Sequence, residues 1–408
     1  MTRIITMLLL IFTFSVSCKK EVPKKISLQE DISFLANDSL LGRETGTPQE
    51  LMAASYIQQR MENIGLLPKG NAGTYFQTFT FKPKTDPHSE AQFVSGDGTI
   101  TGTNVIGYID NNTDKTVIIG AHYDHLGMGG EGSLYAEGEA IHNGADDNAS
   151  GVGIMLQLAQ RLQDTLTGSN YLFIGFSGEE MGLLGSNYFC KNPTIDFDSA
   201  NYMINMDMVG RLREDKTLSI TGTGTAPVWN QVLNSTNAHF KLVLGESGMG
   251  PSDHTSFYLQ DIPALHFFTG QHEDYHKPSD DSEKLNYEGM KMIEDYIVDV
   301  IAELDDAAKL SFRTTKNESE EVPRFKVGLG VMPDYLFDGK GMRIDGVTED
   351  RPAAVAGLQK GDIVIQLGDS TVVDMMSYMR ALSAFEEGGT AKVVVDRDGK
   401  QVEAKVTF

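Results

Sequence analysis

Apolar positions along the chain predict a large region in which strands and helices alternate. Short apolar runs are separated by segments in which apolar residues recur three and four positions apart. Such runs are typical of parallel strands that are buried on both faces of a sheet. We therefore predict an α/β fold with a mostly parallel sheet flanked by helices. The strands are expected within residues 103–109, 115–124, 170–178, 201–210 and 262–270, and the helices within 51–66, 147–164 and 284–310.

The last part of the chain has a different pattern. A polar and charged segment, residues 311–322, is expected to be a linker. Short β-type runs follow it, and Asp398-Gly399 is a turn dipeptide that favours a hairpin. The sequence therefore predicts two domains, an α/β domain at residues 27–310 and a small β-rich domain at residues 323–408.

The first residues have the pattern of an export signal. Arg3 precedes an apolar run that is too short to span a bilayer, and small residues follow it. The stretch "SVSC" resembles the lipobox of a bacterial lipoprotein. This resemblance implies a signal peptide at residues 1–17, a lipid on Cys18 and a tether at residues 18–26. We therefore expect an exported protein, anchored to a membrane and facing the periplasm or the cell exterior.

The net charge argues against one class of function, and the cysteine count argues against an internal disulfide. The chain has 57 acidic and 34 basic side chains, a net charge of -23, which disfavours binding to nucleic acid phosphates. A lipidated Cys18 leaves Cys190 as the only other cysteine, so no disulfide is expected within the chain.

Five motifs at the carboxyl ends of predicted strands carry His, Asp or Glu. In a parallel sheet these ends lie at one edge, where ligands bind. Imidazole and carboxylate groups together are suited to zinc. The motifs are "HYDH" (His122, Asp124, His125), "GADDNASG" (Asp146, Asp147), "SGEEMG" (Glu179, Glu180), "NMDMVG" (Asp207) and "DYHKPSDD" (His276).

The adjacent carboxylates of Glu179 and Glu180 need an explanation, because like charges repel. One interpretation is an acidic, solvated loop. The other is that one carboxylate binds a metal ion and the other acts as a base. The four accompanying motifs favour the second interpretation.

In this order the motifs resemble the co-catalytic dizinc aminopeptidase family. It includes bacterial leucyl aminopeptidases, plasma glutamate carboxypeptidase, glutamate carboxypeptidase II and glutaminyl cyclase. The resemblance covers residues 27–310 and implies two Zn²⁺ ions per chain and peptide substrates. The implied ligands are His122 and Asp207 for one ion, Glu180 and His276 for the other, and Asp146 for both.

The resemblance also implies roles for residues that do not bind metal. Glu179 is expected to be the general base, and Asp124 to hold the second ring nitrogen of His122. Asp253 and His254 in "PSDHTSFY" are expected to line the substrate side of the site, with structural capping as the alternative. The family also tends to have a cis peptide bond after the bridging aspartate, which points to Asp146-Asp147. Three further histidines are expected to be structural: His125, His142 and His266.

The small domain resembles a PDZ domain. Its "VGLGV" stretch is similar to the loop that binds a peptide's C-terminal carboxylate, with Gly328, Leu329 and Gly330 at its centre. A protein or peptide C-terminus is therefore the expected partner. The alternative is a PDZ fold whose groove is unused.

Three functions remain open at this stage. The first is an exported zinc aminopeptidase whose PDZ domain recruits substrate or a partner. The second is another amide specialist, such as a dipeptidase, a carboxypeptidase or a glutaminyl cyclase. Cyclases of this family are mononuclear, so the number of bound zinc ions separates them from the aminopeptidases. The third is an inactive surface protein that acts through the PDZ domain, which the complete set of site residues disfavours.

Overall fold

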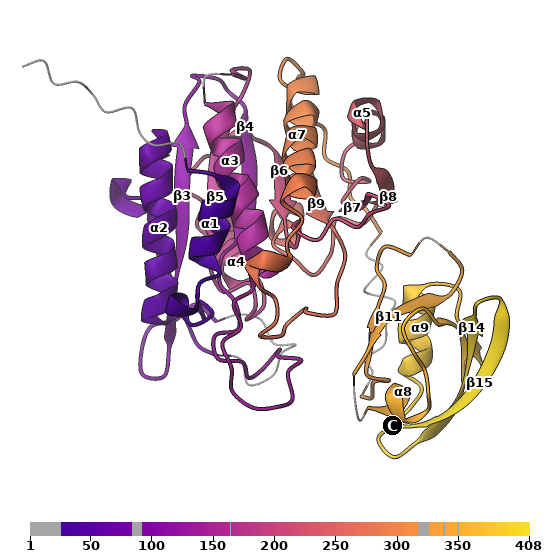
Figure 1. The fold of residues 1–408 in the computed structure, drawn as a ribbon. Helices are drawn as coiled ribbons and strands as arrows, with labels where there is room; N and C mark the ends of the chain where they lie inside the picture. Colours follow the sequence, from indigo (N-terminus) through magenta and orange to yellow (C-terminus); the bar gives the residue numbers. More distant parts are fainter. Residues whose placement is uncertain (1–25, 84–91, 164, 317–325, 338, 349–350) are drawn as a thin grey trace, which may run out of the picture.

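The computed structural model describes residues 26–83, 92–163, 165–316, 326–337, 339–348 and 351–408. These residues form an α/β domain and a small antiparallel β domain, each with its own hydrophobic core (Figure 1). The predicted fold class is confirmed. The proposed signal peptide and Cys18 lie outside the described residues.

The α/β domain is built on a nine-stranded sheet with the order β1-β3-β5-β4-β6-β9-β7-β8, and β2 pairs with β3. The four central strands, β5, β4, β6 and β9, are parallel to one another, whereas the pairings of β3 with β5 and of β7 with β9 are antiparallel. The strands are β1 (Leu67–Pro68), β2 (Phe76–Phe81), β3 (Ile100–Ile109), β4 (Thr116–His122), β5 (Asn170–Phe176), β6 (Ala200–Met206), β7 (Thr217–Thr221), β8 (Lys241–Gly245) and β9 (Ala264–Phe268).

Helices cover both faces of this sheet. Successive side chains of a strand point to opposite faces of the sheet, so buried apolar strands present apolar side chains on both faces. In β4, Val117 and Ile119 pack into the larger core cluster, whereas Ile118 packs into a separate cluster with Phe189 and Phe257. Phe189 is on α4 and Phe257 on α6, so these two helices cover one face. The helices are α1 (Leu28–Leu35), α2 (Pro48–Ile64), α3 (Gly151–Leu162), α4 (Leu184–Lys191), α5 (Trp229–Thr236), α6 (His254–Tyr258) and α7 (Tyr287–Glu303).

Two helices are shorter than their sequence patterns predict. The α-helix expected from Asp147 begins at Gly151. The residues before it, Ala145–Ser150, form a π-helical turn in which Asp147 and Asn148 have non-helical backbone angles. The helix expected at residues 284–310 spans Tyr287–Glu303, with Asn286 as a side-chain N-cap. The first difference determines the geometry of the site.

The small domain contains a six-stranded antiparallel sheet with the order β10-β11-β12-β14-β15, and β13 pairs with β12. Asp398 and Gly399 both have positive φ and form the predicted hairpin turn between the last two strands. The elements are β10 (Val331–Pro333), β11 (Met342–Val347), α8 (Pro352–Val355), β12 (Ile363–Leu367), β13 (Ser370–Thr371), α9 (Met375–Leu382), β14 (Thr390–Arg397) and β15 (Lys400–Thr407).

Contacts of two kinds attach the end of the chain to the α/β domain. The first residues of the predicted linker run along it: Arg313 N donates to Thr225 O, and Thr315 N donates to the hydroxyl of Tyr258. In the small domain, Asp334 and Asp345 both accept hydrogen bonds from Arg213. The small domain is therefore docked next to the part of the sheet formed by β7 and β8 (Figure 1).

Candidate metal centre

The sheet brings the predicted motifs to one edge. In the parallel register His122 pairs with Phe176, Gly120 with Asn205, and Met206 with Phe267. The carboxyl ends of β4, β5, β6 and β9 are therefore level with one another. The segments that leave these ends carry the His, Asp and Glu side chains.

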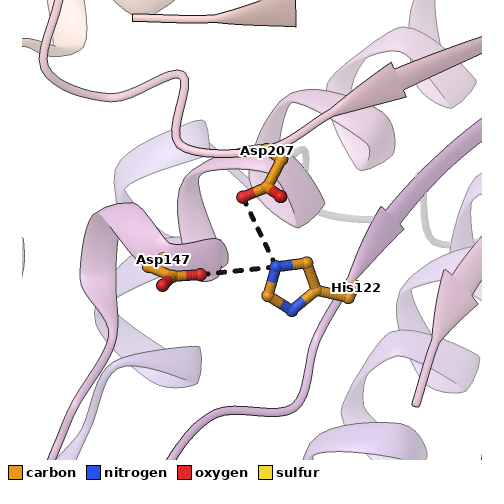
Figure 2. A group of neighbouring side chains, drawn as sticks. All are labelled: His122, Asp147 and Asp207. Atoms are coloured by element: carbon orange, nitrogen blue, oxygen red, sulfur yellow. Dashed lines mark hydrogen bonds and ion pairs between the residues drawn. The ribbon is translucent and has the colours of Figure 1, made fainter. Parts of the chain in front are cut away.

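Two groups of metal-binding side chains occur among the described residues, and they share Asp147. In the first group, the Nε2 atom of buried His122 lies 3.3 Å from Asp147 Oδ1 and 3.4 Å from Asp207 Oδ1 (Figure 2). The three side chains come from different segments and point toward one another.

The second group contains His125, Asp147 and Glu180. His125 Nδ1 lies 2.7 Å from Glu180 Oε1 and 3.9 Å from Asp147 Oδ2. His276 reaches the same two carboxylates, because its Nε2 atom lies 3.1 Å from Asp147 Oδ2 and 3.3 Å from Glu180 Oε2. His276 therefore lies where the sequence predicted it, whereas His125, expected to be structural, also lies among the metal-binding groups.

The prediction that Asp146 is the shared ligand is wrong. Its Oδ1 atom accepts a hydrogen bond from Gly210 N, and its Oδ2 atom lies 3.1 Å from His272 Nε2. Asp147 lies between the two groups instead. Its Oδ1 atom faces His122 and its Oδ2 atom faces His276, and its backbone angles are not helical. The cis peptide bond follows this residue, at Asp147-Asn148, and not at the predicted Asp146-Asp147.

Two buried residues of opposite charge hold the segment that carries Asp147. Asp280 accepts the backbone N–H groups of Asp146 and Asp147. On the preceding residues, the guanidinium of Arg43 donates to the carbonyl oxygens of Asn143 and Gly144. The position of Asp147 therefore depends on contacts with chain segments that are far away in sequence.

Arg43 also holds the segment after β4. Its Nε atom donates to Tyr123 O at 2.7 Å, and Nη1 donates to Leu35 O at 2.7 Å. All four of its hydrogen-bond acceptors are backbone carbonyls, and the residue is 1% exposed. Burial lowers the pKa of Arg43 to about 10, against the opposing effect of nearby carboxylates that include Asp124 and Asp147. The guanidinium therefore stays charged at neutral pH, beside an acidic site.

Asp124 and Glu179 are in contact, which their predicted roles did not specify. The Asp124 carboxylate accepts the backbone N–H of Glu179 at 3.1 Å and the hydroxyl of Thr45 at 3.0 Å. His122 Nδ1 lies 3.2 Å from the backbone carbonyl of Asp124 and 3.7 Å from its carboxylate. The atom of Asp124 within hydrogen-bond distance of the ring is therefore its carbonyl oxygen.

The two adjacent glutamates have opposite pKa shifts. Burial, together with the negative charges of Asp207 and Glu180, raises the pKa of Glu179 well above its usual value. Burial and the charge of Asp147 also tend to raise the pKa of Glu180. His276 and His125 outweigh them and lower this pKa to about 2. Glu180 therefore stays ionised, as a metal ligand must, whereas the surroundings of Glu179 favour its protonated form.

His276 is oriented by the loop that follows "HYDH". Its Nδ1 atom lies 2.7 Å from Gly132 O, and Leu134 N donates to the carbonyl of His276. With one proton on Nδ1, Nε2 faces Asp147 and Glu180 and is the ring atom that can bind a metal ion once its own proton is displaced. Such contacts at the second ring nitrogen are a regular feature of metal-binding histidines.

The remaining predicted residues lie beside the two groups. Asp253 and His254 are fully buried, and among the described residues their side-chain polar atoms lack hydrogen-bond partners. Burial and the neighbouring Asp124 and Asp207 raise the pKa of Asp253 to about 7, whereas the His254 ring stacks on His266 with centroids 4.6 Å apart. The ring nitrogens of His142 form hydrogen bonds with the Ser133 hydroxyl and with the backbone carbonyl of Ala140.

The donor set fits two zinc ions. Each group offers imidazole nitrogen and carboxylate oxygen, which are ligands that zinc accepts, and the shared Asp147 has one oxygen toward each group. Several carboxylates are brought together in a largely buried site, an arrangement that cations stabilise. Zn²⁺ would be held by His122, Asp207 and Asp147 on one side, and by Asp147, Glu180 and a histidine on the other.

Comparison with known proteins identifies both domains. Residues 104–301 match peptidase family M28, and residues 308–408 match the PDZ domain family. The chain therefore carries a family M28 peptidase domain followed by a PDZ domain, as the motifs predicted.

Individual relatives agree with this classification. The alkaline phosphatase isozyme conversion protein of Escherichia coli is 30% identical over 45% of this chain and 51% of its own length. Aminopeptidase YwaD of Bacillus subtilis is 27% identical over 50% of this chain and 45% of its own length. The chain thus spans about half the length of these curated relatives. The structure of BSAP, a zinc aminopeptidase from Bacillus subtilis, has the same fold, with 19% identity, a TM-score of 0.54, and coverage of 73% of this chain and all of that one.

Proposed function

We propose that the protein is a dizinc aminopeptidase that removes N-terminal residues from peptides. The observation that carries the proposal is the pair of metal-binding groups that share Asp147, with Glu179 next to them. Glu179 is partly exposed, and among the described residues its carboxylate has no hydrogen-bond partner, so it is free to meet a water molecule. A family M28 domain provides independent support.

The reaction assigns a separate role to each of the adjacent glutamates. When bound, two zinc ions lower the pKa of a water molecule and stabilise negative charge on the substrate oxygen. Glu179 accepts the proton of the attacking water and delivers it to the leaving amine. Asp124 keeps Glu179 in place through the N–H of its backbone, and Glu180 stays ionised beside His276. The two carboxylates therefore do not compete for one role.

Because Asp147 belongs to both metal-binding groups, the site favours a dizinc peptidase over a mononuclear glutaminyl cyclase. A mononuclear cyclase needs only one group of ligands, whereas this site offers two groups joined by one carboxylate. A dipeptidase or carboxypeptidase is compatible with two ions and differs in the substrate group that is recognised. The decisive test is a panel of peptides with free and acetylated N-termini, assayed together with zinc analysis. Hydrolysis of the acetylated peptides at equal rates, or a single zinc ion with cyclase activity, would contradict the proposal.

We further propose that the protein is exported and anchored through a lipid on Cys18, as the "SVSC" stretch indicates. Among the described residues, no helix is both long and apolar enough to cross a membrane. Cys18→Ser should move the protein from the membrane fraction to the soluble or unprocessed fraction. A mature, membrane-bound variant would rule out the lipid anchor.

A further inference from the structure

The loop before β10 is prepared to bind a carboxylate. Among the described residues, the backbone N–H groups of Gly328, Leu329 and Gly330 have no hydrogen-bond acceptor. Two of the carbonyl groups in the loop already accept hydrogen bonds, because Ala353 N donates to Leu329 O and Thr348 N donates to Gly330 O. Gly330 has φ +71°, and a Cβ atom there would lie 2.2 Å from Arg351 Cβ, so the loop conformation requires glycine. Three N–H groups thus remain for an anion.

The strand that follows this loop is free to pair with a peptide. β10 is at the end of its sheet and pairs only with β11, so its other edge is unpaired within the described structure. A peptide whose C-terminal carboxylate lies at the loop can add to this edge. Its earlier residues then lie along β10 and continue past Pro333. The peptide therefore runs antiparallel to β10, and its N-terminal part leaves the edge of this strand beside Asp334.

The far end of β10 is the place where the PDZ domain contacts the peptidase domain. Asp334 accepts a hydrogen bond from Arg213 at 3.2 Å, and Asp345 accepts one at 2.9 Å. Leu336 is 3% exposed and packs on Gly270, where a Cβ atom would lie 2.7 Å from Leu336 Cδ1.

Both contacts are on segments that lead to the metal centre. Arg213 follows Asp207 by six residues, and Gly270 precedes His276 by six residues. The distance from the end of β10 to the metal centre has an upper limit, because a path along the chain joins them from Pro333 through Leu336 and Gly270 to His276. This path is about 40 Å long, and about a dozen extended peptide residues cover that distance.

We propose that the PDZ groove binds the C-terminus of the peptidase's own substrate and directs the substrate's N-terminus toward the metal centre. The preferred substrates are then extended peptides with a free C-terminal carboxylate, long enough to reach both sites. Binding at the groove raises the effective concentration of the N-terminus at the metal centre and lowers KM. This inference rests on the proposed aminopeptidase function.

The test uses the zinc-loaded full chain and four peptides with the same N-terminal residues. Two have about 20 residues and two have five, and each length is prepared with a free acid and with an amide at the C-terminus. The long acid should exceed the long amide in kcat/KM by at least about tenfold, mainly through KM. The short pair should be hydrolysed equally. A leucine chromogenic substrate reports the metal centre alone.

The outcomes separate this inference from the proposed function. Equal rates for the long acid and the long amide, with the chromogenic substrate still hydrolysed, would overturn the inference and leave the aminopeptidase function intact. An equal acid preference for the short pair would place carboxylate recognition at the metal centre, which also overturns it. Hydrolysis of none of the substrates would refute the proposed function itself.

Two variants test the docked geometry. Arg213→Glu removes the attraction to Asp334 and Asp345, so the preference for the long acid should fall at least threefold while turnover of the chromogenic substrate is retained. Arg161→Glu is the matched control, because Arg161 also forms two ion pairs, with Glu294 and Asp295, within the peptidase domain. An equal loss in both variants, or no loss in Arg213→Glu, would contradict docking as the source of the preference.

Discussion

Arg43 donates a hydrogen bond from Nε to the carbonyl oxygen of Tyr123, at 2.7 Å, and so fixes the backbone between His122 and Asp124. The same guanidinium binds the segment that leads to Asp147. One buried cation therefore connects both sides of the first metal-binding group. Its effect is one of position, since its hydrogen bonds go to carbonyl oxygens and not to carboxylates.

Arg43→Lys should weaken zinc binding by about 10- to 100-fold, the range typical of residues that support metal ligands. Lysine keeps the charge, but its single ammonium group cannot replace a planar guanidinium that reaches four carbonyl oxygens. Zinc affinity is measured by competition with a chelator, and the fold by circular dichroism.

Arg60→Lys is the control for this substitution. Arg60 is 2% exposed and pairs with Asp31 at 2.6 Å, outside the metal centre. This variant should lose stability without losing zinc affinity. If both variants lose zinc affinity equally, the role of Arg43 is general stability and not the position of the ligands.

Asp147→Asn and Asp146→Asn should have different effects on zinc content. Asp147 faces both groups, so a neutral side chain there should reduce binding at both sites and leave less than one ion per chain. The Asn side chain at position 146 still has an oxygen that can accept the Gly210 N–H, so that variant should keep two ions. Zinc per chain is measured by atomic spectroscopy after gel filtration. The reverse result would return the bridging role to Asp146.

Glu179→Gln and Glu180→Gln should fail in different ways. The first removes the base, so zinc should remain while kcat falls about 10²- to 10⁴-fold, with little change in substrate binding. The second removes a charged ligand, so zinc should weaken and added zinc should partly restore activity. Zinc content and turnover, with and without excess zinc, are measured for both. Loss of metal in Glu179→Gln with rescue by zinc would show that the two roles are reversed.

Zinc binding should release protons near neutral pH. Burial alone would lower the pKa of His122 and His276, but the neighbouring carboxylates raise it, to about 11 for His276. These rings therefore hold protons at pH 7 in the metal-free protein, and zinc must displace them. Zinc affinity should accordingly increase as the pH rises. Calorimetry in buffers with different ionisation enthalpies measures the protons released, and a value of zero would contradict this protonation state.

Truncation after Lys316 should preserve turnover of small substrates, whereas truncation after Leu310 should destabilise the peptidase domain. The segment between them contacts α6 and the loop before it: Thr315 N donates to the hydroxyl of Tyr258 at the end of α6, and the Thr315 hydroxyl accepts Gly248 N from the loop. Both shortened chains are compared by thermal unfolding and by turnover of a leucine chromogenic substrate. Equal stability would show that this segment contributes nothing to the peptidase domain.

The sequence was sufficient to predict the fold, because buried parallel strands and amphipathic helices have distinct patterns. It was also sufficient to place His122, Glu180, Asp207 and His276 at one edge of the sheet. It was not sufficient to choose between two adjacent aspartates, since that choice depends on where the helix begins. α3 begins only at Gly151, and the segment before it is held by Arg43 and Asp280, which are far away in sequence and which no local pattern shows.

His125 and Arg43 were missed for different reasons. The second histidine of "HYDH" was visible in the sequence, but a histidine near a strand end is more often structural. Arg43 gave no signal, because it is in a short connection before α2 and contacts residues about 100 positions later. Long-range hydrogen bonds to backbone carbonyls leave no pattern in a single sequence.

The long-range contacts of Arg43 also determine the order in which the molecule can become active. Closing a loop of about 100 residues is slow compared with forming local helices and neighbouring strands. Because Arg43 of the N-terminal segment holds the residues before Asp147, we expect this turn to reach its final shape after that segment has packed against it. During refolding, secondary structure should therefore appear before the capacity to bind zinc, and the two signals should have separate rates. The metal centre is then the last part of the domain to mature, and zinc binding reports the completion of folding.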